Sequence, residues 1–320
     1  MKKFFVIAFS LLPMYLGAQV QTVDPFVLPS ARMAALGGPH AASVAGLDAM
    51  FENPAGFASE TTELGISSLV FNPAGPIFDI IGMVVGGEDP LAGLSTLFDD
   101  NGRLYVQADI LGPLAFGYVG KGLGFGMYNR SVVTLNASSL LTVAYSVSEE
   151  VMLMGGYAYR VRIGDRQVLD AGIMPKGLVR ASIGDISSLS DGIDLASSPG
   201  SLLSGSEFTM VSGLGFDAGV RWSLDDTLAV GLVAHDAFSP AMVTTYTSFT
   251  DFTADPQTAK VGDSAYAIVK PNLAFGIEYN APFALLDKLG AELVVLADYV
   301  DILDLMAVIP RNPILHLGLG

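Results

Sequence analysis

Hydrophobic and polar residues alternate with a period of two along much of the chain beyond Glu63. The clearest run spans 214–222, in which the apolar set is Leu214, Phe216, Ala218, Val220 and Trp222 and the intervening set is Gly215, Asp217, Gly219 and Arg221. Segment 272–279 repeats the pattern, with Leu273, Phe275, Ile277 and Tyr279 as its apolar set. Such alternation indicates strands with one apolar face and one small or polar face. It predicts an all-β fold.

The alternating segments predict about 11 strands. Their lengths lie close to the ~10 residues that a strand of a membrane barrel requires. The segments are 63–70, 103–111, 114–120, 123–132, 139–147, 151–163, 210–223, 227–236, 271–280, 290–300 and 313–320. The short connections are 148–150, 224–226 and 281–289, and the long ones are 164–209, 236–270 and 301–312. Alternating short and long connections are typical of an antiparallel barrel with periplasmic turns and extracellular loops. We therefore expect loops 164–209 and 236–270 to be extracellular.

The chain is apolar for its length of 320 residues, with a mean hydropathy of +0.50 and 15% charged residues. A membrane helix needs roughly 20 apolar residues. The best internal candidate, 77–85, is short and is interrupted by Asp79 and Gly82. Two kinds of fold accommodate so apolar a chain without a membrane helix: one with a large buried core, and a barrel whose outer face meets lipid. The 36 glycines favour the barrel. A soluble β-sandwich shows the same alternation with its apolar face inward, and it stays as an alternative.

Residues 1–18 have the pattern of a secretory signal peptide: two lysines, an apolar stretch from Phe4 to Leu16, and small residues before Gln19. Its removal takes away 2 of 16 basic residues and none of the 32 acidic ones, so the mature net charge is 14 − 32 = −18. So acidic a chain is a poor partner for nucleic acid, whose phosphates need a basic surface. Export favours the barrel over the sandwich, and the absence of cysteine excludes disulfides and a lipoprotein anchor.

The stretch 32–58 differs from the rest because small residues occur throughout it. It contains the pair Gly37-Gly38 and the run Asn53-Pro54-Ala55-Gly56. Proline disfavours helix at the preceding residue, and glycine permits backbone conformations closed to other residues. This composition suits a segment folded tightly in a confined space. We interpret 19–60 as a periplasmic lead followed by a plug, and 61–320 as the barrel.

The same stretch resembles the N-terminal hatch of the FadL-like outer-membrane barrels and their PorV-like relatives. Members carry, in order, a Gly-Gly pair, an Asp-Ala pair and Asn-Pro-Ala-Gly; here these are Gly37, Gly38, Asp48, Ala49, Asn53, Pro54, Ala55 and Gly56. This chain has Pro39-His40 where the family usually has alanine and an aromatic residue. The resemblance implies an antiparallel transmembrane β-barrel of the bacterial outer membrane, with the hatch in its lumen and Gly37, Gly38 and Asp48 in hatch packing.

The resemblance also implies a function. In FadL-like proteins a long-chain fatty acid or similar molecule is captured at the extracellular mouth and leaves sideways through the wall when the hatch shifts. By that analogy Asn53, Pro54, Ala55 and Gly56 would form the ligand gate. On general grounds Leu202, Leu203 and Phe208 are candidates for capture in a loop. The alternative is a PorV-like scaffold that binds other proteins at the outer membrane without transport.

The sequence offers little for catalysis. His40, His235 and His316 lack the spacing of metal ligands, and neither a Gly-x-Ser-x-Gly motif nor a cysteine is present. We therefore expect no enzyme activity, no metal and no cofactor; the expected partners are membrane lipid, a hydrophobic small molecule and, in the alternative, a protein. We interpret the inward acidic residues Asp109, Asp217, Glu278 and Asp298 as lumen polarity, with Arg160, Arg162 and Arg221 as partners.

The last alternating segment, 313–320, ends with the chain. Single-chain bacterial barrels have an even number of strands, and members of the resembled family end on an aromatic-terminated strand. We expect further strands beyond Gly320, without which the barrel would be incomplete.

Overall fold

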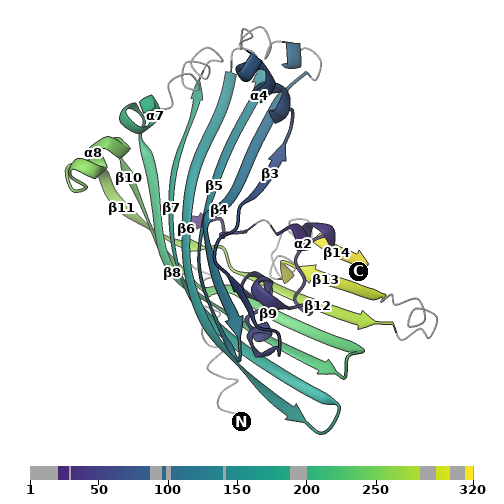
Figure 1. Ribbon diagram of the computed structural model, residues 1–320. Coiled ribbons are helices and arrows are strands. Elements are labelled where there is room, and N and C mark those ends of the chain that lie inside the picture. The colour runs from purple at the N-terminus through teal and green to yellow at the C-terminus, as the bar shows by residue number, and fades with distance from the viewer. Residues whose placement is uncertain are drawn as a thin grey trace.

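The computed structural model describes residues 21–28, 30–86, 96–98, 102–139, 142–187, 200–281, 293–302 and 314–319. Within them, 14 strands form one large curved sheet. The N-terminal segment, described at residues 24–28 and 30–62, lies against its inner side (Figure 1). The predicted signal peptide, 1–18, lies outside the described residues.

Five long strands form the middle of the sheet as an antiparallel meander. They are β4 Leu104–Gly120, β5 Leu123–Ser139, β6 Thr142–Ile163, β7 Gln167–Ser187 and β8 Phe208–Leu224. Residue pairs in register run almost the full length of each neighbour, so these strands form a continuous wall.

The sheet divides into two branches beyond β8 (Figure 1). The first half of β8 pairs with β10 (Pro240–Tyr246), and the second half pairs with β9 (Leu228–Phe238). β10 continues to β11 (Lys260–Val269), and β9 continues through β12 (Asn272–Asn280) and β13 (Val294–Val300) to β14 (Ile314–Leu319). β1 (Gln21–Val23) pairs parallel to β11. The N-terminal lead is thereby attached to the wall.

At the other edge, β4 pairs with two short strands, β2 (Glu63–Gly65) and β3 (Val70–Ala74). The helical elements are α2 Ala31–Ala35, η2 Gly46–Asp48, α3 Ala49–Glu52, η3 Pro54–Ala58, α4 Ile77–Gly86, α7 Gly200–Gly205 and α8 Phe249–Ala254. None of the helices in the described residues is both long and apolar enough to cross a membrane.

The two faces of the sheet differ as the alternation predicts. On β6, Val151, Leu153 and Tyr157 are exposed on the outer face, whereas Met152 and Met154 are buried on the inner face. On β8 the contrast is sharper, because Leu214 is 73% exposed and Asp217 is 2% exposed. The exposed apolar side chains of these strands thus point away from the N-terminal segment. The inner face packs Met152, Met154 and Met174 against the segment in a buried apolar cluster.

The all-β prediction is confirmed, and two predicted loops are wrong. β7 occupies much of 164–209, and β10, α8 and β11 occupy most of 236–270. The predicted turn at 148–150 lies inside β6, whereas the turn at 224–226 separates β8 from β9. The predicted connections 281–289 and 301–312 lie almost entirely outside the described residues. Within the described residues the sheet is open between β14 and the edge formed by β2 and β3.

Candidate functional site: the interface between the N-terminal segment and the sheet

The N-terminal segment lies on glycines that face inward from successive strands. Four cross-strand pairs consist of glycine on both sides: Gly117 with Gly126, Gly124 with Gly156, Gly172 with Gly219, and Gly231 with Gly276. A methyl group built on Gly124 would lie 2.5 Å from the Phe57 ring, and one on Gly172 would lie 2.7 Å from the Ala55 nitrogen. Side chains at these positions would collide with the segment, so glycine permits its close approach.

Asn53 fixes the turn in which the segment meets this surface. Its Oδ1 accepts a hydrogen bond of 3.0 Å from the Ala55 amide, and Pro54 begins η3. Its Nδ2 donates to the carbonyl oxygens of Ala41 at 2.8 Å and Val220 at 3.3 Å. Asn53, Pro54, Ala55 and Gly56 are all buried. The predicted gate residues therefore lie together in close contact with β7 and β8.

Polar contacts hold a second part of the segment, residues 40–42, to strands β8 and β13. His40 Nδ1 lies 2.5 Å from Asp298 Oδ2 on β13, and the Ala41 amide donates to Asp298 Oδ1 at 2.7 Å. On β8, Arg221 Nε donates to the Ala42 carbonyl at 2.7 Å. The backbone of 41–42 is therefore fixed at both ends, above Gly231 and Gly276.

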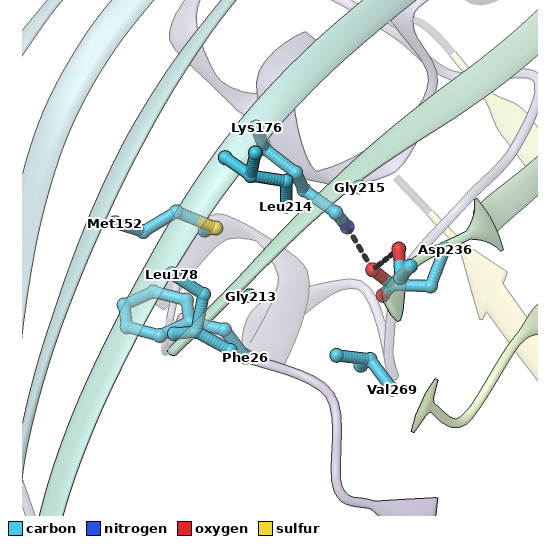
Figure 2. Close-up of a pocket in the computed structure, with 10 residues that line it drawn as sticks. Phe26, Met152, Lys176, Leu178, Gly213, Leu214, Gly215, Asp236 and Val269 are labelled. Carbon is cyan, nitrogen blue, oxygen red and sulfur yellow. Dashed lines mark hydrogen bonds and ion pairs between the residues drawn. The ribbon is translucent and has the colours of Figure 1, made fainter. Parts of the chain in front are cut away.

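A buried ionic cluster lies next to this contact. Lys176 Nζ is 2.8 Å from Asp217 and 3.0 Å from Asp236. Asp217 also accepts a 2.7 Å hydrogen bond from the Asp236 amide and lies 3.3 Å from His235. Figure 2 shows Lys176 extended toward Asp236, with Phe26 lower in the view beside Leu178. These residues line a small cavity of about 10 Å³. The positive charge of Lys176 offsets part of the negative charge of the two carboxylates, Asp217 and Asp236, away from solvent.

The other inward charges pair across neighbouring strands. Arg130 binds Asp109 through two hydrogen bonds of 2.7 and 2.8 Å, and Arg160 binds Asp170 at 2.7 and 3.0 Å. Arg180 pairs with Glu150 and donates to the Asp24 carbonyl at 3.1 Å. Of the predicted acidic set, Asp109, Asp217 and Asp298 are buried and Glu278 is partly buried. Arg160 and Arg221 make the inward contacts given above, whereas Arg162 is exposed.

A cavity of about 160 Å³ remains between the segment and the sheet. The segment contributes Phe26, Met50 and Phe51 to its lining, and the sheet contributes Met152, Met174 and Val233. Its polar lining comprises His40, Glu52, Lys176, Asp217, His235, Asp236 and Asn272. The cavity therefore combines apolar walls with a few polar groups, as small-molecule sites do.

Glu52, the last residue of α3, is the least satisfied of these polar groups. It is 1% exposed, and within the described residues neither carboxyl oxygen makes a hydrogen bond of ordinary geometry, although the backbone amide of His40 approaches the group. Burial raises the pKa of Glu52 to about 9, although the charge of Arg32, 3.7 Å away, opposes the shift. The carboxyl group is therefore protonated at neutral pH, with one donor and one acceptor to offer.

The other predicted site residues are dispersed. Gly37 and Gly38 follow α2, with positive φ angles of 90° and 142°. Asp48 accepts a hydrogen bond from Ser30 and lies 3.4 Å from Arg32, so it joins two parts of the segment. All three residues lie in the segment, consistent with a packing role.

The proposed capture residues do not form one surface. Leu202 belongs to α7, and its side chain lies outside the described residues. Leu203, in the same helix, is 46% exposed. Phe208 is 2% exposed and packs against Tyr246 and Phe252, with ring centroids 5.2 and 5.6 Å away. Phe208 therefore stabilises the joint between β8, β10 and α8 and is not a loop residue open to a ligand.

Sequence reasoning missed Glu52, Lys176 and the partnership of His40 with Asp298. A signal existed for Glu52, because it is the single acidic residue in the run Ala49–Ala58 of mostly small and apolar residues. Lys176 lay in a range predicted to be a loop. His40 and Asp298 are 258 positions apart, and no local pattern joins them.

Comparison of this chain with protein-family models, with curated proteins and with solved structures finds no match. The resemblance to the FadL-like and PorV-like barrels therefore stays a prediction from residues 37–56.

Proposed function

We propose that this chain forms the wall and the hatch of a bacterial outer-membrane β-barrel that transports hydrophobic small molecules, such as long-chain fatty-acid-like compounds. In this proposal the N-terminal segment is the hatch, and a shift at Asn53–Gly56 opens a lateral exit through the wall. The observation that carries the proposal is the cavity between the segment and the sheet, which has apolar walls and a few polar groups.

The outer face of the sheet supports a membrane location. Its exposed apolar side chains come from every long strand and include Phe125, Leu153, Ile173, Leu214 and Val220. Contiguous apolar surface of this extent marks contact with lipid or with another protein. Alternation of apolar outward and polar inward residues is the pattern of a membrane barrel.

Transport can be tested in liposomes that contain the protein, with uptake of a labelled fatty acid as the readout. We expect protein-dependent uptake that saturates with ligand concentration, and liposomes without protein serve as the control. Deletion of residues 19–58 should change the rate, because it removes the hatch. Uptake that survives this deletion unchanged, or no uptake at all, would contradict the proposal.

The scaffold function is the second candidate, and α4 favours it. Phe78, Ile81 and Val85 on this helix are exposed, away from the cavity. A protein partner could cover them. The test is a purification in mild detergent: a stably bound protein that is lost on substitution Phe78→Asp, together with absence of transport, would favour the scaffold.

A further inference from the structure

We propose that the cavity beneath the N-terminal segment binds an uncharged amphipathic molecule, such as an alcohol or an amide, whose polar group forms a hydrogen bond with Glu52. This inference rests on the transport function proposed above and narrows its ligands to uncharged molecules, so that an ionised fatty acid would be a poorer ligand than the corresponding alcohol. It starts from the one carboxyl group in the cavity lining that the described residues leave without a hydrogen bond of ordinary geometry.

The Glu52 carboxyl group is buried, and neither of its oxygens has a hydrogen-bond partner of ordinary geometry among the described residues. A buried polar group without a hydrogen bond is costly, and native proteins retain few of them. Arg32 is the nearest cation, but its Nη1 lies 3.7 Å from Oε2, its side chain is 40% exposed, and it also faces Asp48. A hydroxyl or amide group in the cavity would supply the missing partner.

The charges around the cavity disfavour an anionic ligand. Asp217, Asp236 and Asp298 all lie at or beside it on the sheet side. Lys176 is already within 3.0 Å of two of these carboxylates, and His40 is held by the third. A ligand carboxylate would therefore enter a buried space in which the nearest cations are engaged by acidic side chains. An uncharged polar group avoids that cost.

The rest of the lining suits an apolar tail. Phe26 and Phe51 from the segment and Met152 and Met174 from the sheet line the cavity. Methionine is flexible and adapts to ligands of different shapes. A dry apolar cavity of about 150 Å³ accommodates benzene, so six-carbon molecules are suitable probes for a cavity of about 160 Å³.

The experiment compares 1-hexanol with hexanoate, which have the same chain length and differ in the polar group. Binding to the full chain in detergent is measured at pH 7 by ligand-observed NMR, and difference infrared spectroscopy follows the carbonyl stretch of the protonated Glu52 carboxyl. We expect hexanol to bind at least about ten-fold more tightly than hexanoate. Hexanol should also shift the carbonyl band to lower frequency.

Two substitutions of Glu52 separate hydrogen bonding from shape. Glu52→Gln keeps an uncharged donor and acceptor, so it should retain hexanol binding to within a few-fold and lose the carboxyl band. Glu52→Leu removes both groups and should weaken hexanol binding by about ten-fold or more. Glu278→Leu is the matched control, because Glu278 lines a different cavity near the β8–β9 turn; it should bind as the wild type does. Circular dichroism verifies that each variant is folded.

The outcomes are distinct from those of the uptake assay. Preference for hexanol that Glu52→Gln keeps and Glu52→Leu loses supports the inference. Equal or tighter binding of hexanoate, or a preference that survives in Glu52→Leu, overturns it. Should Glu52→Leu not fold, the wild-type preference and the band shift lost in Glu52→Gln decide the matter. Failure of fatty-acid uptake in liposomes counts against transport of fatty acids and leaves the ratio of hexanol to hexanoate binding unchanged.

Discussion

His40 Nδ1 lies 2.5 Å from Asp298 Oδ2, and this contact joins the N-terminal segment to a strand 258 positions later in the chain. Both side chains are almost completely buried, and the same carboxylate accepts the Ala41 amide. The segment is therefore anchored to β13 as well as to the middle of the sheet. Release of the segment requires these polar contacts to be broken in the protein interior. Hydrogen bonds are stronger there than in water.

Removal of Asp298 should release this anchor. Asp298→Ala leaves His40 and the Ala41 amide without their partner in a buried place, so we expect a loss of about 3–5 kcal/mol in the free energy of unfolding. Proteolysis within residues 30–60 should become faster. Asp226→Ala, in an exposed turn, is the control and should change neither property. Equal protease resistance in the two variants would show that the contact does not hold the segment.

The glycine contacts predict a difference between two positions on β7. Gly172 faces inward, where a methyl group would meet the backbone of 54–55, whereas a methyl group on Gly177 would lie at an ordinary 3.5 Å from Leu214. We expect Gly172→Ala to destabilise the protein by about 1–3 kcal/mol through overpacking. Gly177→Ala should have little effect. Thermal unfolding in detergent measures both, and similar melting temperatures would contradict the close packing.

Asn53 offers a test based on the direction of hydrogen bonds. Asn53→Ala removes three of them and leaves buried backbone groups unpaired, at about 1–3 kcal/mol each. Asn53→Asp keeps the acceptor for the Ala55 amide but turns an oxygen toward the carbonyls of Ala41 and Val220, so we expect it to be at least as damaging. Hydrogen exchange at residues 53–58 is the readout, with exposed Asn136→Ala as control. Wild-type protection in Asn53→Asp would refute this geometry.

Glu52 predicts a dependence of stability on pH. Its pKa is raised by burial from an ordinary value near 4.5 to about 9, so between these values the folded protein binds one more proton than the unfolded chain. The free energy of unfolding should therefore fall as pH rises through this window, by up to about 1.4 kcal/mol per unit for one group. Below pH 4.5 the contribution of Glu52 no longer changes with pH.

The variant Glu52→Gln isolates this contribution. It cannot titrate, so the slope of unfolding free energy between pH 5 and 9 should become flatter than in the wild type. Chemical denaturation at several pH values gives the slope. If the slope in Glu52→Gln equals that of the wild type or is steeper, the pKa of Glu52 is not raised in the folded protein.

The alternation along β8 predicted both its extent and its faces. The expected strand 210–223 became Phe208–Leu224, with Phe216 outward and Asp217 inward. The same reasoning missed β7, because Lys176 and Arg180 stand at its inward positions and Pro175 interrupts it. Those charges are acceptable in a buried strand only because neighbouring strands supply Asp217 and Glu150. A single strand's sequence does not contain that information.

The candidate site was predictable only where its signal was local. The small residues around Asn53 and the Asn-Pro pair indicated a tightly packed segment, and residues 53–56 are buried together. The anchor at Asp298 depends on the position of β13, which follows from the pairing of β9, β12 and β13 far along the chain. Pairing of that kind is set by tertiary structure, so local patterns did not reveal it.

The aligned glycines have a consequence for how the strands find their register. A slip of one residue turns the apolar side chains of a strand to the wrong face, so alternation guards against it. A slip of two residues keeps every side chain on its original face, so the alternation does not disfavour it. It would, however, move Gly172 or Gly219 from beneath Asn53 and Pro54 and put a larger side chain there. The N-terminal segment, which precedes these strands in the chain, thus helps to fix their register through its contacts with Gly172 and Gly219.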